Sequence, residues 1–200
     1  MDIKHVLDFW FGHLDNQGLP IEPMNKLWFG SSELGDAAIR QHFGQVHTQA
    51  SEGVLGHWLA TAEGRLALII VLDQFSRNIY RGQPVAFSYD ATALGLCKQG
   101  LELGIERELP LAYKLFFYMP LQHSEQIEDQ FLGVAMLERL LPGLTGAARA
   151  QVEDTLRFQR LHLDIIERFG RFPHRNAVLQ RRSTEAELAY LADGAPRFGQ

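Results

Sequence analysis

The stretch Arg65 to Arg81 contains an apolar run followed directly by acidic, amide and basic side chains that could bind a ligand or transfer a proton. Residues 66–72 are all apolar, which predicts a helix that is buried on every side. The run is too short to cross a bilayer, which takes about 20 apolar residues. The polar residues that follow it are Asp73, Gln74, Arg77, Asn78, Tyr80 and Arg81. Because buried polar groups need partners, we expect protein groups or a ligand to engage them.

An ordinary helix end explains part of the same cluster. The arginines would bond the last free carbonyls of the helix, and Asn78 would take a left-handed turn. This interpretation leaves Asp73 and Gln74 on a helix that is otherwise apolar. The structural and the functional interpretation therefore both stand.

A second cluster begins at His123-Ser124-Glu125 and continues to Asp129. Ser124 is predicted to cap a helix, on which Glu125 and Asp129 lie one turn apart. Like charges at this spacing cost about 0.2–0.5 kcal/mol, so we expect a cation between them. We predict an arginine from segment 168–176 or segment 73–78.

A metal ion is the alternative cation, with His123 as a third ligand. The spacing matches no strong zinc or iron signature, so we predict no metal and no cofactor.

The third cluster, residues 168–176 followed by Arg181 and Arg182, is the most basic region of an acidic chain. Its candidate binding residues are Arg171, His174, Arg175 and Asn176. The pair Arg77-Asn78 recurs as Arg175-Asn176, and we predict that the two loops form one anion site. The competing interpretation is that the arginines only neutralise Glu125, Asp129 and Asp73. His162, on an apolar helical face, is predicted to be a hydrogen-bonded core residue.

The elements predicted to position these clusters are all helices. Apolar spacing, caps and glycines place them at about 3–12, 32–51, 61–75, 84–100, 111–119, 124–140, 145–169 and from 184 onward. The predicted caps are Asp2, Ser31 or Ser32, Thr61, Ser124, Thr145, and Thr184 with Glu187. Pro120 is predicted to stop the helix that begins at Leu111. We expect one all-α domain over residues 1–200, built of about seven or eight helices in antiparallel pairs.

Composition narrows the class of protein. The chain has 200 residues, 46% of them apolar, which is enough for one substantial core. A net charge of −5 argues against nucleic-acid binding. There is one cysteine, Cys97, and the N-terminus shows no signal-peptide pattern, so we expect a cytoplasmic protein without a membrane partner.

Four blocks of the chain form a distinctive set of motifs: LDFWFG (7–12), LDQFSRNIYRG (72–82), YMPLQHSE (118–125) and RFGRFPHRNAVL (168–179). Together, and in this order, they resemble the bacterial family called domain of unknown function 924. The resemblance implies an all-α fold similar to tetratricopeptide repeats, with right-handed α–α pairs and no settled activity, so it assigns no catalytic residue. The family pattern has Pro in place of Ser76 and Gly in place of Gln180, and both positions are expected in loops.

Two functions follow from these observations. In the first, the clustered arginines bind a small anionic ligand carrying phosphate or carboxylate, with Tyr80 alongside. His123, His174 and Glu125 are then the candidates for acid–base chemistry, and whether a reaction occurs stays open. In the alternative, a helical-repeat module binds an acidic peptide. The sequence carries no Ser-His-Asp signature, phosphate loop or zinc motif, and it predicts no oligomeric state.

Overall fold

The computed structural model describes residues 2–30, 32–196 and 198. Within these residues the protein is all-α, with eight helices of at least seven residues. The described backbone forms no β-strand, and its one β-type contact is an isolated bridge between Leu14 and Pro20. In the described ranges, no helix combines the length and the apolar character needed to span a membrane.

Most of the elements follow one another with short connections, and longer loops precede α2 and α10. The elements are α1 (Ile3–Phe11), α2 (Asn25–Phe29), α3 (Glu33–Ser51), η1 (Gly56–Ala60), α4 (Ala62–Ile69), η2 (Ile70–Phe75), α5 (Ser76–Ile79), η3 (Pro84–Phe87), α6 (Asp90–Leu103), η4 (Ile105–Glu108), α7 (Leu111–His123), α8 (Ile127–Glu138), α9 (Gly146–Phe169), η5 (Pro173–Arg175) and α10 (Glu185–Ala192). The turn η2 is π-helical, and the other η segments are 3₁₀-helical.

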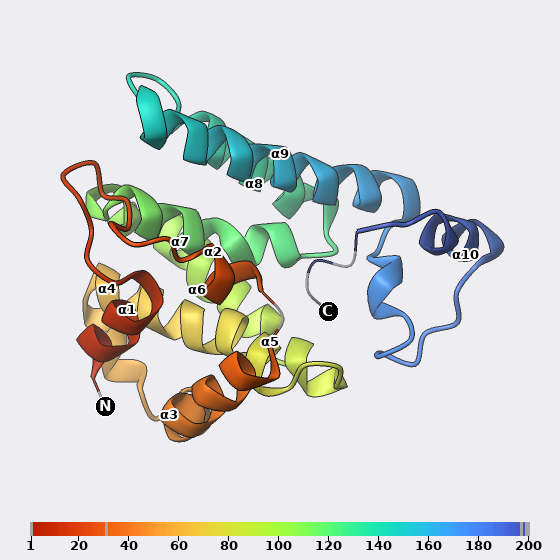
Figure 1. Cartoon of the computed structure of the whole chain (residues 1–200), viewed down its shortest axis with the longest axis horizontal. Helices are drawn as coiled ribbons and strands as arrows, with labels where there is room; N and C mark the ends of the chain where they lie inside the picture. The colour runs from red at the N-terminus through yellow and green to blue at the C-terminus, as the bar shows by residue number, and fades with distance from the viewer. Residues whose placement is uncertain (1, 31, 197, 199–200) are drawn as a thin grey trace.

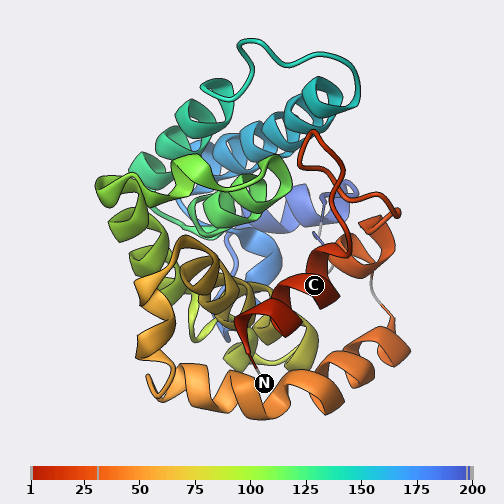
Figure 2. The same ribbon diagram turned by 90° about the vertical axis from the view of Figure 1, so that its left-hand side faces the viewer.

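Consecutive helices pack on one another across the molecule. Helices α8 and α9 lie side by side at one end, with α7 against both of them, and α3 lies at the opposite end (Figures 1 and 2). The central segment α4–η2–α5 contacts α3, α6 and α7. Helix α10 lies to one side, and residues 193–196 run back from it toward the middle of the molecule (Figure 1).

The central helix is longer than the sequence predicts. Thr61 caps it as expected, because its hydroxyl accepts a hydrogen bond from the N–H of Gly64. Instead of ending near Phe75, it passes through the π-helical turn η2 and ends at Ile79. Ser76, expected in a loop, therefore lies in a continuous helix and is buried. The π turn carries Asp73, and such turns are frequent at functional sites.

Pro120 does not stop α7, contrary to expectation. The helix continues to His123 with Pro120 inside it. A proline removes one helical hydrogen bond and strains the turn before it. Burial of the helix on several sides, including Phe117 and Leu121, offsets that cost. The consequence is that His123 occupies the last turn of a buried helix.

Most of the other predicted helix starts are confirmed. The Asp2 and Ser32 side chains cap α1 and α3, and Thr184 with Glu187 forms a capping box. Ser31, the other predicted cap for α3, lies outside the described residues. Ser124 is not a helix cap, because α8 begins at Ile127. The predicted helix 84–100 is divided into the 3₁₀ turn η3 and helix α6.

The core consists of two apolar clusters. The larger contains the aromatic rings of Trp10, Phe75 and Phe116, which meet edge to face. The smaller lies under the end of α9 and contains Ile165, Ile166 and Phe172. His123 lies within ring-contact distance of His162 on α9.

Candidate functional site

The site is centred on a buried pair formed by Asp73 and His123. The Nδ1 atom of His123 lies 2.8 Å from Oδ1 and 3.0 Å from Oδ2 of Asp73. Asp73 is fully buried in η2, and His123 comes from the last turn of α7. Two elements far apart in the sequence therefore meet at one imidazole–carboxylate contact.

The protonation states of this pair follow from its surroundings. Burial raises the pKa of Asp73, but the charge of Arg77 and the hydrogen bonds from His123 and Gln74 outweigh it and hold that pKa well below its usual range. The ionised carboxylate only accepts hydrogen bonds, so Nδ1 of His123 carries the hydrogen. Burial and the Arg77 charge lower the pKa of His123 despite Asp73. His123 is thus neutral at pH 7, with its Nε2 lone pair available to accept a proton.

Arg77 binds two carboxylates from this cluster. Its Nη1 and Nη2 donate to the two oxygens of Asp90 at 2.8 Å and 3.0 Å, in the bidentate geometry that suits arginine. Nη1 also lies 3.2 Å from Asp73 and donates to the Asp73 backbone carbonyl. Asp73 lies in η2 and the helix continues to Ile79, so this carbonyl is not one of the last free carbonyls that the sequence predicts an arginine to bond.

Arg175 reaches the same place from η5. Its Nη1 donates to the backbone carbonyl of His123 at 3.1 Å and lies 3.6 Å from Asp90. Its guanidinium also lies between two rings, 4.9 Å from the centre of Phe87 and 4.4 Å from that of Phe172. The two Arg-Asn segments do converge, and the carboxylate they share is that of Asp90.

Unlike Arg77, Arg175 has a buried nitrogen without a hydrogen-bond partner among the described residues. That atom is its Nε. Burial and the Arg77 charge lower the pKa of Arg175 to about 10, so the side chain stays charged at neutral pH. A buried donor without an acceptor is costly, which marks Arg175 as the cation with spare capacity.

Two further histidines lie beside the pair. The His162 ring centre is 6.4 Å from that of His123, and its Nδ1 donates to the carbonyl of Phe158. His162 is therefore the hydrogen-bonded core residue that the sequence predicts. The Nδ1 atom of His174 is also buried, and it has no hydrogen-bond partner among the described residues. Burial lowers the pKa of both histidines to about 3.

Glu125 is held by an arginine, but not by one from the predicted segments. Arg181 binds its two oxygens at 2.7 Å and 3.0 Å, and the N–H of Phe172 donates to it at 2.8 Å. These groups outweigh burial and lower the pKa of Glu125. Arg181 also donates to the Phe172 carbonyl, so the pair fixes the loop that carries η5.

The arginine predicted for Asp129 is replaced by a lysine. Lys98 on α6 lies 2.8 Å from Asp129, and the Ser124 hydroxyl donates to the same carboxylate. Ser124 in turn accepts from the N–H of Gln126. Because Asp129 is bound by α6 and Glu125 by the η5 loop, the two carboxylates share no cation.

The other predicted site residues make contacts elsewhere. Asn78 and Arg81 both donate to Asp36 on α3, and Asn78 is helical rather than left-handed. Arg171 pairs with Glu187 on α10, as a bidentate contact.

Three more predicted site residues, Gln74, Asn176 and Tyr80, contact other side chains of the protein. Gln74 donates to Asp73 and to the sulfur of Met119. Asn176 bridges Ser183 and Arg181, and Tyr80 packs edge to face on His47.

The close contact of His47 with Ser76 is not an activated nucleophile. The Nε2 atom of His47 lies 2.7 Å from the Ser76 hydroxyl, which itself donates to the carbonyl of Leu72 at 2.6 Å. The hydroxyl has one hydrogen, so His47 is the donor in this pair. Ser76 is also fully buried.

Sequence reasoning missed Asp90, Phe87 and Asp36. An acid at the start of a helix is expected to complement the helix dipole, so Asp90 carried no separate signal. Phe87 falls within the predicted helix 84–100, whereas it lies in the 3₁₀ turn η3 against the guanidinium groups of Arg77 and Arg175.

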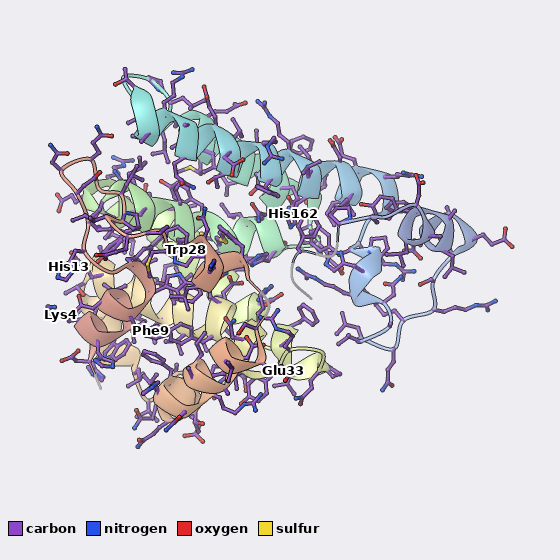
Figure 3. All side chains as sticks on the ribbon, viewed as in Figure 1. Lys4, Phe9, His13, Trp28, Glu33 and His162 are labelled. Atoms are coloured by element: carbon purple, nitrogen blue, oxygen red, sulfur yellow. The ribbon has the colours of Figure 1, made fainter. Side chains whose placement is uncertain are left out.

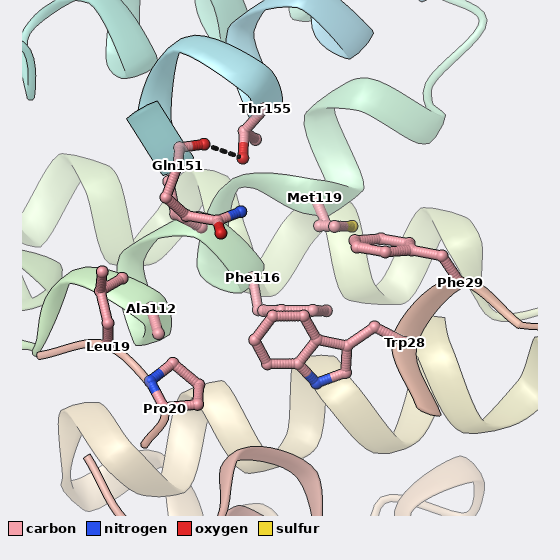
Figure 4. Close-up of a pocket in the computed structure, with 10 residues that line it drawn as sticks. Leu19, Pro20, Trp28, Phe29, Ala112, Phe116, Met119, Gln151 and Thr155 are labelled. Atoms are coloured by element: carbon pink, nitrogen blue, oxygen red, sulfur yellow. Dashed lines mark hydrogen bonds between the residues drawn. The ribbon is translucent and has the colours of Figure 1, made fainter. Parts of the chain in front are cut away.

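Two hollows in the structure lie away from this cluster. One, of about 20 Å³, has room for about one water molecule and lies between the loop before α2 and helices α7 and α9 (Figure 4). Its walls include Trp28, Phe116 and Met119, with the hydrogen bond from Thr155 to the Gln151 carbonyl at its rim (Figure 4). The other is a groove of mixed charge between α8 and α9.

Metal ligation has no support in the described ranges. No group of three or more His, Cys, Asp or Glu residues there has a geometry that suits a metal ion. His123, proposed as a third ligand with Glu125 and Asp129, is bonded to Asp73 instead.

The comparisons with known proteins agree with the whole-chain resemblance. A family model described as "Bacterial protein of unknown function (DUF924)" matches residues 6–195. A solved structure, a protein of unknown function called ATU0120 from Agrobacterium tumefaciens, is 31% identical with a TM-score of 0.75, over 96% of this chain and 97% of that one. A search of curated proteins finds no match. The chain therefore belongs to the DUF924 family of bacterial proteins.

Proposed function

We propose that the protein binds a small anion, a phosphate or a carboxylate, beside the Asp73–His123 pair. Arg175 supplies the positive charge, and His123 is the group that gains or loses a proton. The observation that supports this is the buried Nε of Arg175, which has no acceptor among the described residues. A ligand oxygen would satisfy that donor and remove a penalty of about 1–3 kcal/mol.

The charge balance of the cluster explains the role of His123. Asp73 and Asp90 are matched by Arg77 and Arg175, so the four ionised side chains sum to zero. An incoming anion adds negative charge, which favours the protonated form of His123. We therefore expect anion binding to be accompanied by proton uptake.

The sequence suggests four arginines as anion-binding residues: Arg77, Arg81, Arg171 and Arg175. Our proposal keeps one of them. Arg81 and Arg171 each bind a carboxylate in bidentate fashion away from His123, and Arg77 binds Asp90. These arginines stabilise the fold in our proposal. Arg175 alone is assigned to the ligand.

The alternative function is a tetratricopeptide-like module that binds an acidic peptide. Its support is the packing of α6 on α7, α7 on α8 and α8 on α9, which resembles a repeat stack. Because most of the arginines assigned to the peptide already bind carboxylates, the small anion is the better proposal. We propose a cytoplasmic location for either function, since the lone Cys97 has no disulfide partner.

Sulfate tests the proposal because it stays fully ionised near neutral pH. We expect sulfate to raise the melting temperature of the wild type by mass action, and Arg175→Gln to abolish the rise. Arg160→Gln, at a surface ion pair with Glu138, is the matched control and should respond like the wild type. If Arg175→Gln does not fold by circular dichroism, His123→Gln replaces it. A wild type that responds to no sulfate, phosphate or carboxylate overturns the proposal.

A further inference from the structure

An aromatic side chain from the end of the chain lies beside the proposed anion site. The ring of Phe198 is centred 3.9 Å from the imidazole of His162, with 35° between their planes. It is also 5.4 Å from the ring of His174. Figure 3 labels His162 on α9, and Figure 1 shows residues 193–196, after α10, running back toward α9. Phe198 thus contacts two histidines from different elements.

A third ring completes the surroundings of Phe198. Phe172 is centred 5.5 Å from His162 and 5.5 Å from His174. We call the group formed by His162, Phe172 and His174 the aromatic seat. Such spacings are typical of favourable contacts between aromatic rings.

The aromatic seat borders the anion site on two sides. His162 faces His123 at 6.4 Å between ring centres. The guanidinium of Arg175 lies 4.4 Å from the ring centre of Phe172. A ligand with a ring in the seat would therefore hold its own anionic group near Arg175 and His123.

Both histidines of the aromatic seat present uncharged rings at neutral pH. The Nδ1 hydrogen of His162 is donated to a backbone carbonyl, which fixes the neutral tautomer. Burial lowers the pKa of both His162 and His174 to about 3. Uncharged rings stack on aromatic groups without the cost of desolvating a cation.

The backbone of Phe198 indicates that its ring is held by these contacts. Its φ angle is +49°, in the left-handed region that L-residues other than Asn and Asp seldom adopt. A residue in that region carries a steric penalty that the surrounding contacts must offset. Phe198 therefore occupies the aromatic seat at a cost, and a free aromatic ring would not bear that cost.

We propose that the aromatic seat is the subsite for an aromatic ring of the ligand, and that Phe198 fills it as an internal substitute until the ligand displaces it. The ligand class is then an aromatic anion, an aryl carboxylate, phosphate or sulfonate. This inference rests on the proposed function, because the anionic group is the part that Arg175 would bind. A tethered ring competes at high effective concentration, so Phe198 weakens ligand binding in the wild type.

Two sulfonates of equal charge, one with an aromatic ring and one without, distinguish the contribution of the ring to binding from that of the anionic group. Benzenesulfonate and methanesulfonate are titrated by calorimetry into the wild type, Phe198→Ala and Phe131→Ala. Phe131 is an exposed phenylalanine on α8 and serves as the control. We expect Phe198→Ala to bind benzenesulfonate about tenfold more tightly than the wild type does, the scale of one aromatic contact. Methanesulfonate should bind all three proteins equally.

A wall of the aromatic seat provides a second variant. His174→Ala removes a side chain whose Nδ1 makes no hydrogen bond in the described structure, so its removal leaves no partner unsatisfied. We expect it to reduce the preference for benzenesulfonate over methanesulfonate. This variant keeps the proposal testable if Phe198→Ala does not fold.

The outcomes distinguish this inference from the proposed function. If both sulfonates bind Phe198→Ala with equal affinity, the aromatic subsite is wrong while the anion site stands. If the ring preference appears but is the same in the wild type and Phe198→Ala, Phe198 is not a competitor and the displacement is wrong. If neither sulfonate nor sulfate binds the wild type or Phe198→Ala, the anion site fails and the inference fails with it.

Discussion

The imidazole of His123 lies 2.8 Å from the carboxylate of Asp73, and this contact joins the end of α7 to the π-helical turn of the central helix. It exists because α7 continues through Pro120 to His123, so that its last turn reaches Asp73 in η2. An ionised, fully buried carboxylate holds the ring by Nδ1 and leaves Nε2 free. This is the arrangement that orients a histidine for proton transfer.

Stability should fall as the pH is lowered from 7 toward 4. The unfolded chain binds protons on His162 and His174 near pH 6.5, whereas their folded pKa values are about 3. Between these values the unfolded state holds more protons, so each histidine contributes a slope of up to about 1.4 kcal/mol per pH unit. Asp73, with its lowered pKa, acts in the same direction at lower pH.

Urea unfolding at a series of pH values measures this slope. His174→Gln should flatten it, while His13→Gln, at an exposed position, should not. Equal slopes in the wild type and His174→Gln would contradict the pKa of His174 given above.

Sulfate binding should take up protons near pH 7. The proposed site is electrically balanced before the anion arrives, so binding raises the pKa of His123. Calorimetry in two buffers of different ionisation enthalpy gives the number of protons taken up. We expect a fractional uptake that His123→Gln removes, with affinity rising as the pH falls from 7.5 to 6. An uptake that persists in His123→Gln would assign the proton to another group.

Removing Arg181 should lower the free energy of unfolding, because Arg181 and not a metal ion neutralises Glu125. Arg181→Ala leaves Glu125 partly buried without its cation and frees the Phe172 loop. Charged hydrogen bonds of this kind contribute about 1.5–3 kcal/mol. Chemical denaturation measures the loss, and Glu125→Ala with Arg181→Ala closes a double-mutant cycle. A coupling energy of zero would show that Arg181 and Glu125 do not form a pair. In a separate test, a chelator should leave the melting temperature of the wild type unchanged.

Truncating a buried side chain of helix α4 should cost far more than truncating an exposed one. Ile69 is fully buried, and Ile69→Ala should lower the free energy of unfolding by about 2–5 kcal/mol. Leu34 is 85% exposed, and Leu34→Ala should change it by less than about 0.5 kcal/mol. Equal losses at the two positions would contradict the central place of α4.

Glycine at position 180 should stabilise the protein. Gln180 has a φ of +54°, in the left-handed region, at a position where the family pattern has glycine. Gln180→Gly removes the steric cost and is expected to raise the free energy of unfolding by about 0.5–1 kcal/mol. Gln45→Gly, in the exposed face of α3, is the control and should lower it by about 1 kcal/mol. A loss at position 180 would mean that the Gln180 side chain makes a stabilising contact.

The sequence by itself determined most of the helices and the burial of Asp73. Apolar spacing and short-range caps act within a few residues, so Asp2, Ser32, Thr61 and the Thr184–Glu187 box are readable without a structure. The burial of Asp73 followed equally from the seven apolar residues before it. Signals of this kind depend on neighbours along the chain.

Only the tertiary structure decided which charge meets which. Lys98 reaches Asp129 because α6 packs on α7, which α8 contacts in turn. Arg181 reaches Glu125 because the chain after η5 returns to Phe172, whose carbonyl accepts a hydrogen bond from Arg181. Asp90 brings Arg77 and Arg175 together although nothing in its local sequence distinguishes it from an ordinary first-turn acid. An ion pair is selected by distance in space, and distance in space depends on how every helix between the partners ends. Pro120 shows why this is hard to foresee, since one helix that continues for an extra turn moves His123 onto Asp73.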